Sequence, residues 1–111
     1  MRLKERELIT VYLKKHLVTE NSDGDETIIY SDKSVELKMN VQNAGGTVNA
    51  QIYGMRLPYI KACKYQGLVI KEGENELDGL CVFVESEDRP DYHIQSIQTF
   101  STHLNIMIER L

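Results

Sequence analysis

The sequence is most informative at first through what it lacks. It has no apolar signal segment at its N-terminus, no run long enough to span a bilayer and no Asn-x-Ser/Thr acceptor. It has no tryptophan and only two cysteines, Cys63 and Cys81. Both cysteines lie in apolar runs, where a thiol is usually a small buried hydrophobe. We therefore expect both to be reduced and structural, in a protein made in a cytoplasm.

An excess of positive charge is also missing. The net charge is −4, which argues against a protein that grips nucleic acid by its phosphates, because such a protein needs clustered Lys and Arg. Residues 72–91 hold eight acids and one base, whereas the first fifteen residues hold five bases and two acids. This asymmetry suits head-to-tail packing of subunits. Taken alone, however, the charges favour a simpler interpretation, in which acidic loops keep a small domain soluble.

The length and composition predict one globular domain over residues 1–111. Hydrophobic residues make up 41% of the chain and charged residues 27%, an ordinary globular balance. A chain of this size buries enough surface to fold around a single core. There is no internal repeat, low-complexity tract or linker that would divide it.

Alternation of apolar and polar residues predicts most of the elements as strands. Residues 7–18 alternate, although a helix over residues 3–17 competes with the strand. Residues 34–42 alternate more clearly, residues 80–84 predict a strand buried on both faces, and residues 91–98 and 103–110 predict a hairpin. The predicted core comprises Val35, Leu37, Met39, Val41, Leu80, Val82, Leu104, Ile106 and Ile108.

The remaining segments predict turns, two shorter strands and one helix. Residues 21–25 read as a turn in which Gly24 can adopt positive φ, followed by a strand over residues 27–30. The period changes over residues 48–57, which predicts a short helix that Pro58 ends by about Leu57. Residues 59–65 return to strand, and residues 67–79 form a loop with a solvated acidic part. The predicted fold is all-β: a small antiparallel barrel or sandwich of six to seven strands with one short helix.

The sequence offers no constellation typical of catalysis. Its histidines, His16, His93 and His103, show no His-x-His or His-x₃-His spacing. The expected hairpin register places His93 and His103 roughly 16 Å apart, too far to share a metal ion. The glycine pair at residues 45–46 lacks the Lys and Ser/Thr of a phosphate-binding loop. We predict that the protein is not an enzyme and has no metal or cofactor site.

Several short motifs follow one another in a recognisable order. The run Val41-Gln42-Asn43-Ala44-Gly45-Gly46 is followed by Tyr53-Gly54-Met55-Arg56-Leu57, then by Gly79-Leu80-Cys81-Val82-Phe83-Val84 and Pro90-Asp91-Tyr92-His93-Ile94. In this order the chain resembles the head-closure (head–tail connector or stopper) proteins of tailed bacteriophages and prophages. Many of those proteins carry a tryptophan after the first turn, where this chain has Tyr30. The resemblance therefore leaves stopper, adaptor and tail-completion roles open.

The resemblance implies a structural role in virion assembly. Such a barrel forms a homo-oligomeric ring below the portal and adaptor, closes the DNA-filled head and docks the tail. The protein would be made in the bacterial host cytoplasm, reside in the virion neck and contact no membrane. Packaged DNA would pass nearby without specific binding, and the isolated chain can be a monomer. The expected partner-interface residues are Arg2, Lys4, Arg6, Tyr53, Arg56 and Leu57, and the expected channel-loop residues are Glu72, Glu74, Glu76 and Asp78.

Two interpretations from other classes stay open at the level of sequence. One is a non-viral cytoplasmic β-barrel interaction module. The other is a small hydrolase or ligand-binding barrel, which would need a deep apolar pocket with converging polar groups. The neighbouring genes would distinguish the first of these from a phage protein, because portal and tail genes would flank a neck gene.

Overall fold

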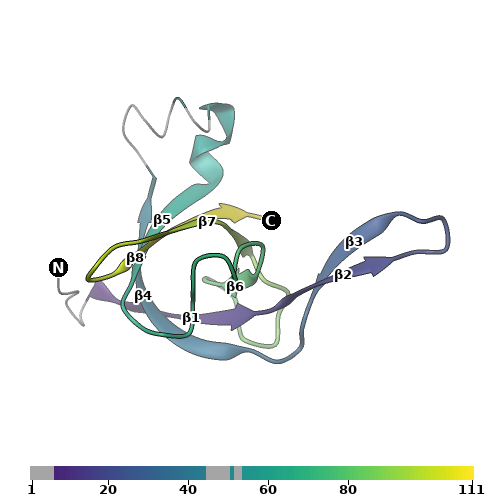
Figure 1. Ribbon diagram of the computed structural model, residues 1–111, viewed down its shortest axis with the longest axis horizontal. Helices are drawn as coiled ribbons and strands as arrows, with labels where there is room; N and C mark the ends of the chain where they lie inside the picture. Colours follow the sequence, from purple (N-terminus) through teal and green to yellow (C-terminus); the bar gives the residue numbers. More distant parts are fainter. Residues whose placement is uncertain (1–6, 45–50, 52–53) are drawn as a thin grey trace.

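Six antiparallel strands close into a barrel. The computed structural model describes residues 7–44, 51 and 54–111. The strands follow the order β1-β4-β5-β8-β7-β6 around the barrel, which confirms the predicted small all-β fold (Figure 1). Their bounds are β1 Ile9–Lys14, β4 Val35–Asn43, β5 Ile60–Tyr65, β6 Gly79–Cys81, β7 Tyr92–Thr99 and β8 Leu104–Arg110.

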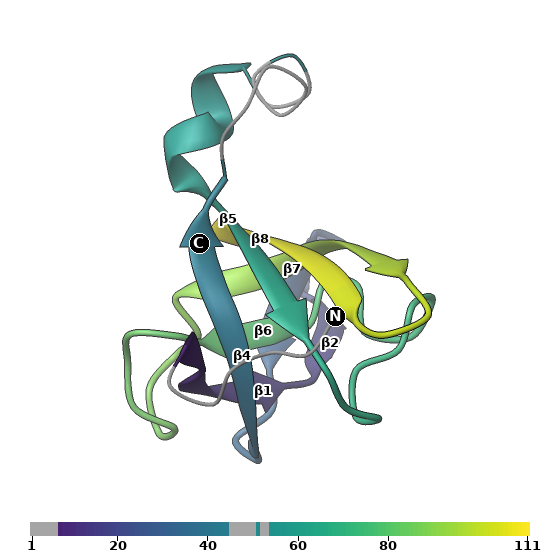
Figure 2. The ribbon, with the colours of Figure 1, turned by 90° about the vertical axis from the view of Figure 1, so that its left-hand side faces the viewer.

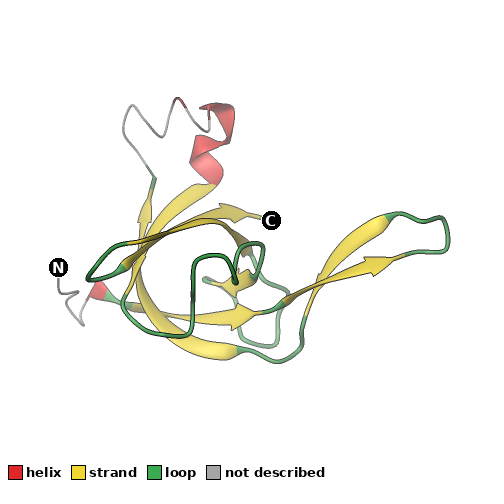
Figure 3. Cartoon of the chain, viewed as in Figure 1, coloured by secondary structure: helices red, strands yellow, loops and turns green. Residues whose placement is uncertain are grey.

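A second, two-stranded sheet projects from one end of the barrel. It consists of β2 (His16–Glu20) and β3 (Glu26–Tyr30), and Figures 1 and 3 show it extending away from the other strands. The predicted turn between them is confirmed: the Asn21 side chain accepts hydrogen bonds from the N–H groups of Asp23 and Asp25, both at 2.9 Å. Gly24 has a φ of 85°, a conformation that glycine adopts without a steric cost. The strand predicted over residues 7–18 is correct, but it is divided between β1 and β2.

One short helix stands on the barrel between β4 and β5. The 3-10 helix η2 spans Gly54–Tyr59, and Figure 2 shows it rising above the ends of these strands. Of the helix predicted over residues 48–57, residues 48–50 and 52–53 lie outside the described residues. The observed helix continues through Pro58 instead of ending at Leu57. Proline donates no hydrogen bond, but its fixed φ matches 3-10 geometry, so a six-residue helix accommodates it near its end.

The predicted core is confirmed except at one position. Seven of its members are buried, and Val41 is partly buried against them. Val35 is 47% exposed, so its assignment to the core is wrong. At Val35 the strand β4 pairs only with β1, because its pairing with β5 is confined to residues 40–43. One side of Val35 is therefore left open.

The apolar run over residues 80–84 is a strand only at its start. The ladder of β6 ends at Cys81, and Phe83 is 66% exposed, so the prediction of a strand buried on both faces is wrong beyond Val82. The carboxylate of Asp91 accepts hydrogen bonds from the N–H groups of Val82 (2.8 Å) and Phe83 (3.0 Å). A side chain thus takes the place of a neighbouring strand and turns the backbone away from the barrel.

Candidate interaction surfaces

The projecting hairpin, residues 16–30, exposes apolar side chains that the barrel does not cover. We call it the hairpin arm. Val18 is 58% exposed, Leu17 51%, Ile29 44% and Ile28 40%. Leu17 pairs with Ile29 and Val18 with Ile28, and directly paired residues share a face. The hairpin arm therefore presents an apolar pair on each of its two faces.

A buried carboxylate fixes the base of the hairpin arm to the barrel. Asp78 is fully buried, and its Oδ1 lies 2.6 Å from Nδ1 of His16. The same oxygen accepts the backbone N–H of His16 at 3.1 Å, and Oδ2 accepts a hydrogen bond from Nδ2 of Asn75 at 2.9 Å. Nζ of Lys15 lies 3.4 Å from Oδ2. Asp78 thus ties the first residues of the hairpin arm to the loop that precedes β6.

These contacts govern the protonation of Asp78. Burial alone raises the pKa of this carboxyl, but the hydrogen bonds from His16 and Asn75, together with the charge of Lys15, outweigh burial and lower the pKa below its ordinary value. The preceding residue, Leu77, has a φ of 73°, which a bulky side chain rarely adopts. Asp78 was expected to be solvated with the rest of its loop, and that prediction is wrong. The hydrogen bonds supplied by His16 and Asn75 offset the cost of burying its charge.

The base of the arm also packs closely against β6. A Cβ atom at Gly79 would lie 2.9 Å from Cδ1 of Tyr30 and 2.6 Å from Cγ of Pro90, both too close for real side chains. Glycine at this position lets the ring of Tyr30 lie against the backbone of β6. Burial at this contact is the main reason that the pKa of Tyr30 is raised. The hairpin arm is therefore held at its base and exposed along its length.

The second projecting surface is η2, which contains two of the predicted partner-interface residues. Arg56 forms a two-point ion pair with Glu109 on β8, with Nε and Nη2 each 2.6 Å from a carboxylate oxygen. This contact is the main cause of the lowered pKa of Glu109. No residue of η2 is buried: Met55 is 96% exposed and Leu57 is half-buried. The ion pair therefore holds an exposed helix to the barrel.

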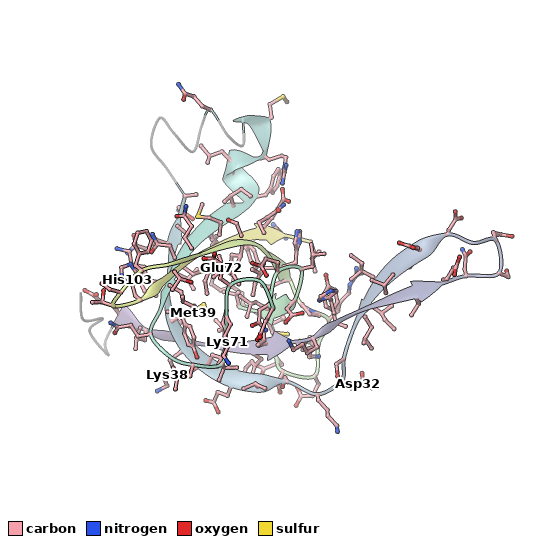
Figure 4. All side chains as sticks on the ribbon, in the orientation of Figure 1. Asp32, Lys38, Met39, Lys71, Glu72 and His103 are labelled. Carbon is pink, nitrogen blue, oxygen red and sulfur yellow. The ribbon has the colours of Figure 1, made fainter. Side chains whose placement is uncertain are left out.

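The predicted channel-loop residues differ in their surroundings. Glu72 is tied to the end of β7, since its Oε1 accepts hydrogen bonds from the N–H (2.9 Å) and Oγ1 (3.1 Å) of Thr99. Glu76 caps its own turn through the N–H of Gly73, and Glu74 is exposed. Figure 4 shows Glu72 beside the barrel rather than on the hairpin arm. The predicted residues Arg2, Lys4, Arg6 and Tyr53 lie outside the described residues.

Two comparisons with known proteins give no match for this chain. Neither the scan against protein-family models nor the search of curated proteins gives a match. Across residues 7–44, 51 and 54–111, no group of three or more His, Cys, Asp or Glu side chains could hold a metal ion. Among those same residues, no helix is long and apolar enough to cross a membrane.

Sequence reasoning missed the hairpin arm as an exposed element and missed its buried anchor. A signal for the arm was present, because Leu17-Val18 and Ile28-Ile29 are adjacent apolar pairs on either side of the turn at residues 21–25 and so put an apolar residue on each face of a hairpin. The contact between His16 and Asp78 joins residues 62 positions apart, and nothing in the local pattern indicates it.

Proposed function

We propose that this protein is a structural protein of a phage or prophage neck. In this role it closes the DNA-filled head as a ring below the portal and adaptor, docks the tail and catalyses no reaction. The observation that carries the proposal is the pair of segments, the hairpin arm and η2, that leave the barrel and expose apolar side chains. Exposed apolar surface of this kind on a small domain is typical of a protein that is completed by its partners.

The division of the chain into a rigid body and projecting parts supports this role. The barrel encloses a continuous core that includes Met39, Leu80 and Ile106, each fully buried. Both projections are fixed at their bases by ion pairs, at Asp78 and at Glu109. A subunit that fixes the position of one neighbour relative to another needs a rigid body and firmly anchored contact segments. The sequence motif behind the family resemblance includes residues 54–57 of η2, one of these two projections.

The acidic loop is compatible with DNA that passes without being bound. Glu74 is exposed, and the segment 72–78 carries four acids and no base. Like charges repel phosphates at short range, so such a loop would favour sliding rather than attachment of DNA. Asp78 does not contribute to this effect, because its carboxylate is buried and paired.

Deletion of this gene from the phage or prophage that carries it tests the proposal. We expect heads that package DNA and then lose it, together with separate finished tails. Expression of the wild-type gene in trans should restore infectious particles. Stable DNA-filled heads with defective tails would instead identify a tail-completion protein, and normal infectious particles would show that the neck role is wrong.

A further inference from the structure

The distal half of the hairpin arm carries acidic side chains that no base offsets. Residues 17–30 contain Glu20, Asp23, Asp25 and Glu26 and neither lysine nor arginine. Glu20 and Glu26 are direct partners in the β2–β3 ladder, and like charges in that position destabilise a hairpin. Of the residues that the structure describes, no lysine, arginine or histidine forms an ion pair with these four acids. A partner that brings positive charge to the end of the arm would therefore stabilise it.

The two faces of the arm differ in character. Side chains alternate along a strand, so Val18 and Glu20 share one face with their partners on β3, whereas Leu17 and Thr19 share the other. One face is thus apolar near the barrel and acidic toward the tip. The opposite face is apolar and then neutral. A strand that paired with this hairpin would need bases on one side and uncharged or apolar residues on the other.

The outer edge of β2 is open to such a strand. Among residues 7–44, 51 and 54–111, the sheet consists of β2 and β3 alone, and residues 17–30 hold none of the lysines or prolines that usually protect an edge. Beside β3, residues 27–30 line a groove whose wall includes two bases, Lys14 and Arg89. Along β2 the nearest base is Lys15, which is paired with Asp78 and lies five positions, about 16 Å of extended chain, from Glu20. Positive charge therefore fits the edge of β2 better than that of β3.

The segment that precedes β1 has the matching pattern in its sequence. In an extended conformation, successive side chains of residues 1–6 point to opposite sides. Arg2, Lys4 and Arg6 would share one side, and Met1, Leu3 and Glu5 the other. With the three bases on the acidic face of the arm, Leu3 would join the apolar face of the arm, and the single acid of the segment would lie on the face that has no acid.

The segment cannot reach the arm of its own chain. Strand β1 runs toward the arm and leads into β2 in nearly one line (Figure 1). The eleven positions from Ile9 to Glu20 span about 36 Å of extended chain. The five positions from Lys4 to Ile9 can span at most about 18 Å. A contact between the basic segment and the acidic end of the arm therefore joins two copies.

We propose that residues 2–6 of one copy of this chain add as a strand to the open edge of β2 in the next copy. Backbone hydrogen bonds of the new strand supply affinity, and the bases beside Glu20 and Glu26 fix its register. The contact is heterologous, and such contacts generate rings when the rotation between subunits closes. The inference deepens the proposed neck function, on which it rests only in placing the contact within a ring.

Site-directed cross-linking of the purified full chain tests the contact. Leu3→Cys places a thiol on the segment, and Thr19→Cys places one at an exposed position on the neutral face of β2. The native cysteines are buried, so the wild-type protein sets a low background for a short bifunctional thiol reagent. In a mixture of the two variants we expect a dimer in which peptide mapping joins residue 3 to residue 19. Val35→Cys, at a position 47% exposed on β4, replaces Thr19→Cys in the matched control. No dimer above background, or an equal yield with the control, would overturn the proposal.

Charge reversal on both sides of the contact gives a second measurement. Glu20→Lys with Glu26→Lys, added to the Thr19→Cys variant, should lower the yield of dimer about fivefold or more. Arg2→Glu with Lys4→Glu, added to the Leu3→Cys partner, should then restore it. Glu74→Lys with Glu87→Lys changes the net charge equally at exposed positions outside the arm and should leave the yield unchanged. An equal loss in that control, or no restoration by the second reversal, would contradict the assignment.

The outcomes separate this contact from the neck function. Cross-linking as expected, with normal particles from the gene deletion, leaves the contact in place and removes the neck role. Leaking heads from the deletion, with no cross-link between residues 3 and 19, mean that other surfaces close the ring.

Discussion

Asp78→Ala tests whether one carboxylate anchors the hairpin arm. The substitution removes the acceptor for three donors: Nδ1 and the backbone N–H of His16, and Nδ2 of Asn75. Asn75 is only 2% exposed, so its amide N–H cannot be hydrated once Asp78 is removed. The side chains of His16 and Lys15 are partly exposed and can be hydrated. A buried donor without a partner costs about 1–3 kcal/mol. We therefore expect a loss of about 1–3 kcal/mol in the free energy of unfolding.

Urea denaturation followed by circular dichroism measures this loss. With a slope of about 1–3 kcal/mol per molar, the midpoint should fall by about 0.3–3 M. Glu74→Ala, an exposed acid in the same loop, is the matched control and should leave the midpoint unchanged. A midpoint for Asp78→Ala equal to that of the control would refute the anchoring role.

The stability that Asp78 contributes should change with pH in a definite direction. Since folding lowers the pKa of Asp78, the unfolded chain binds more protons than the folded one between the lowered value and the ordinary value of about 4. The contribution of Asp78 is therefore complete above this window and is lost as the pH falls through the folded pKa. The difference in stability between wild type and Asp78→Ala should shrink on acidification below about pH 4. A difference that stayed constant down to the lowest pH tolerated would contradict the assignment.

Three further predictions concern the core, the helix and the thiols. Ile106→Ala should lower the free energy of unfolding by about 2–5 kcal/mol in urea titrations, because Ile106 is fully buried in the barrel. Arg56→Ala should lower the free energy of unfolding by about 1 kcal/mol or less, since its pair with Glu109 is partly exposed, yet it should abolish complementation of the gene deletion; full complementation would exclude η2 from the interface. Cys63 and Cys81 should resist thiol reagents in the folded protein, because burial raises the pKa of Cys63 to about 12 and also raises that of Cys81, and the double Ala variant should still assemble; complete loss of assembly from a folded monomer would reveal a missed role.

The strands were predictable because their pattern is local. Alternation over β4 and β8 identifies inward residues such as Leu37 and Ile108 without knowledge of their neighbours. The errors arise where contacts between distant parts of the chain decide whether a side chain is buried. Val35 fits the apolar–polar alternation but lacks a neighbouring strand on one side. The backbone at Phe83 donates a hydrogen bond to Asp91, and its side chain is turned outward.

The candidate surfaces were less predictable than the fold. Sequence motifs pointed to Arg56 and Leu57, and these residues do lie on a projecting helix. The acidic loop looked uniform in sequence, yet Glu74 is exposed while Asp78 is buried beneath the hairpin arm. The difference depends on His16, which the fold brings from 62 positions away. No count of charges along the chain could separate the two acids.

The short strand β6 gives the barrel a mechanical weak point. It pairs with β1 only from Tyr12 to Lys14 and with β7 only at Gly79 and Leu80, whereas β7 and β8 pair along their whole length. The hairpin arm joins β1 one residue after Lys14 and joins β4 through residues 31–34, so one of the two strands that would carry tension on the arm is paired with β6. Asp78 sits at that junction and transfers part of the load to the preceding loop. We expect a pull on the arm to open the barrel first along β6, and removal of the Asp78 carboxylate to lower the force that is needed.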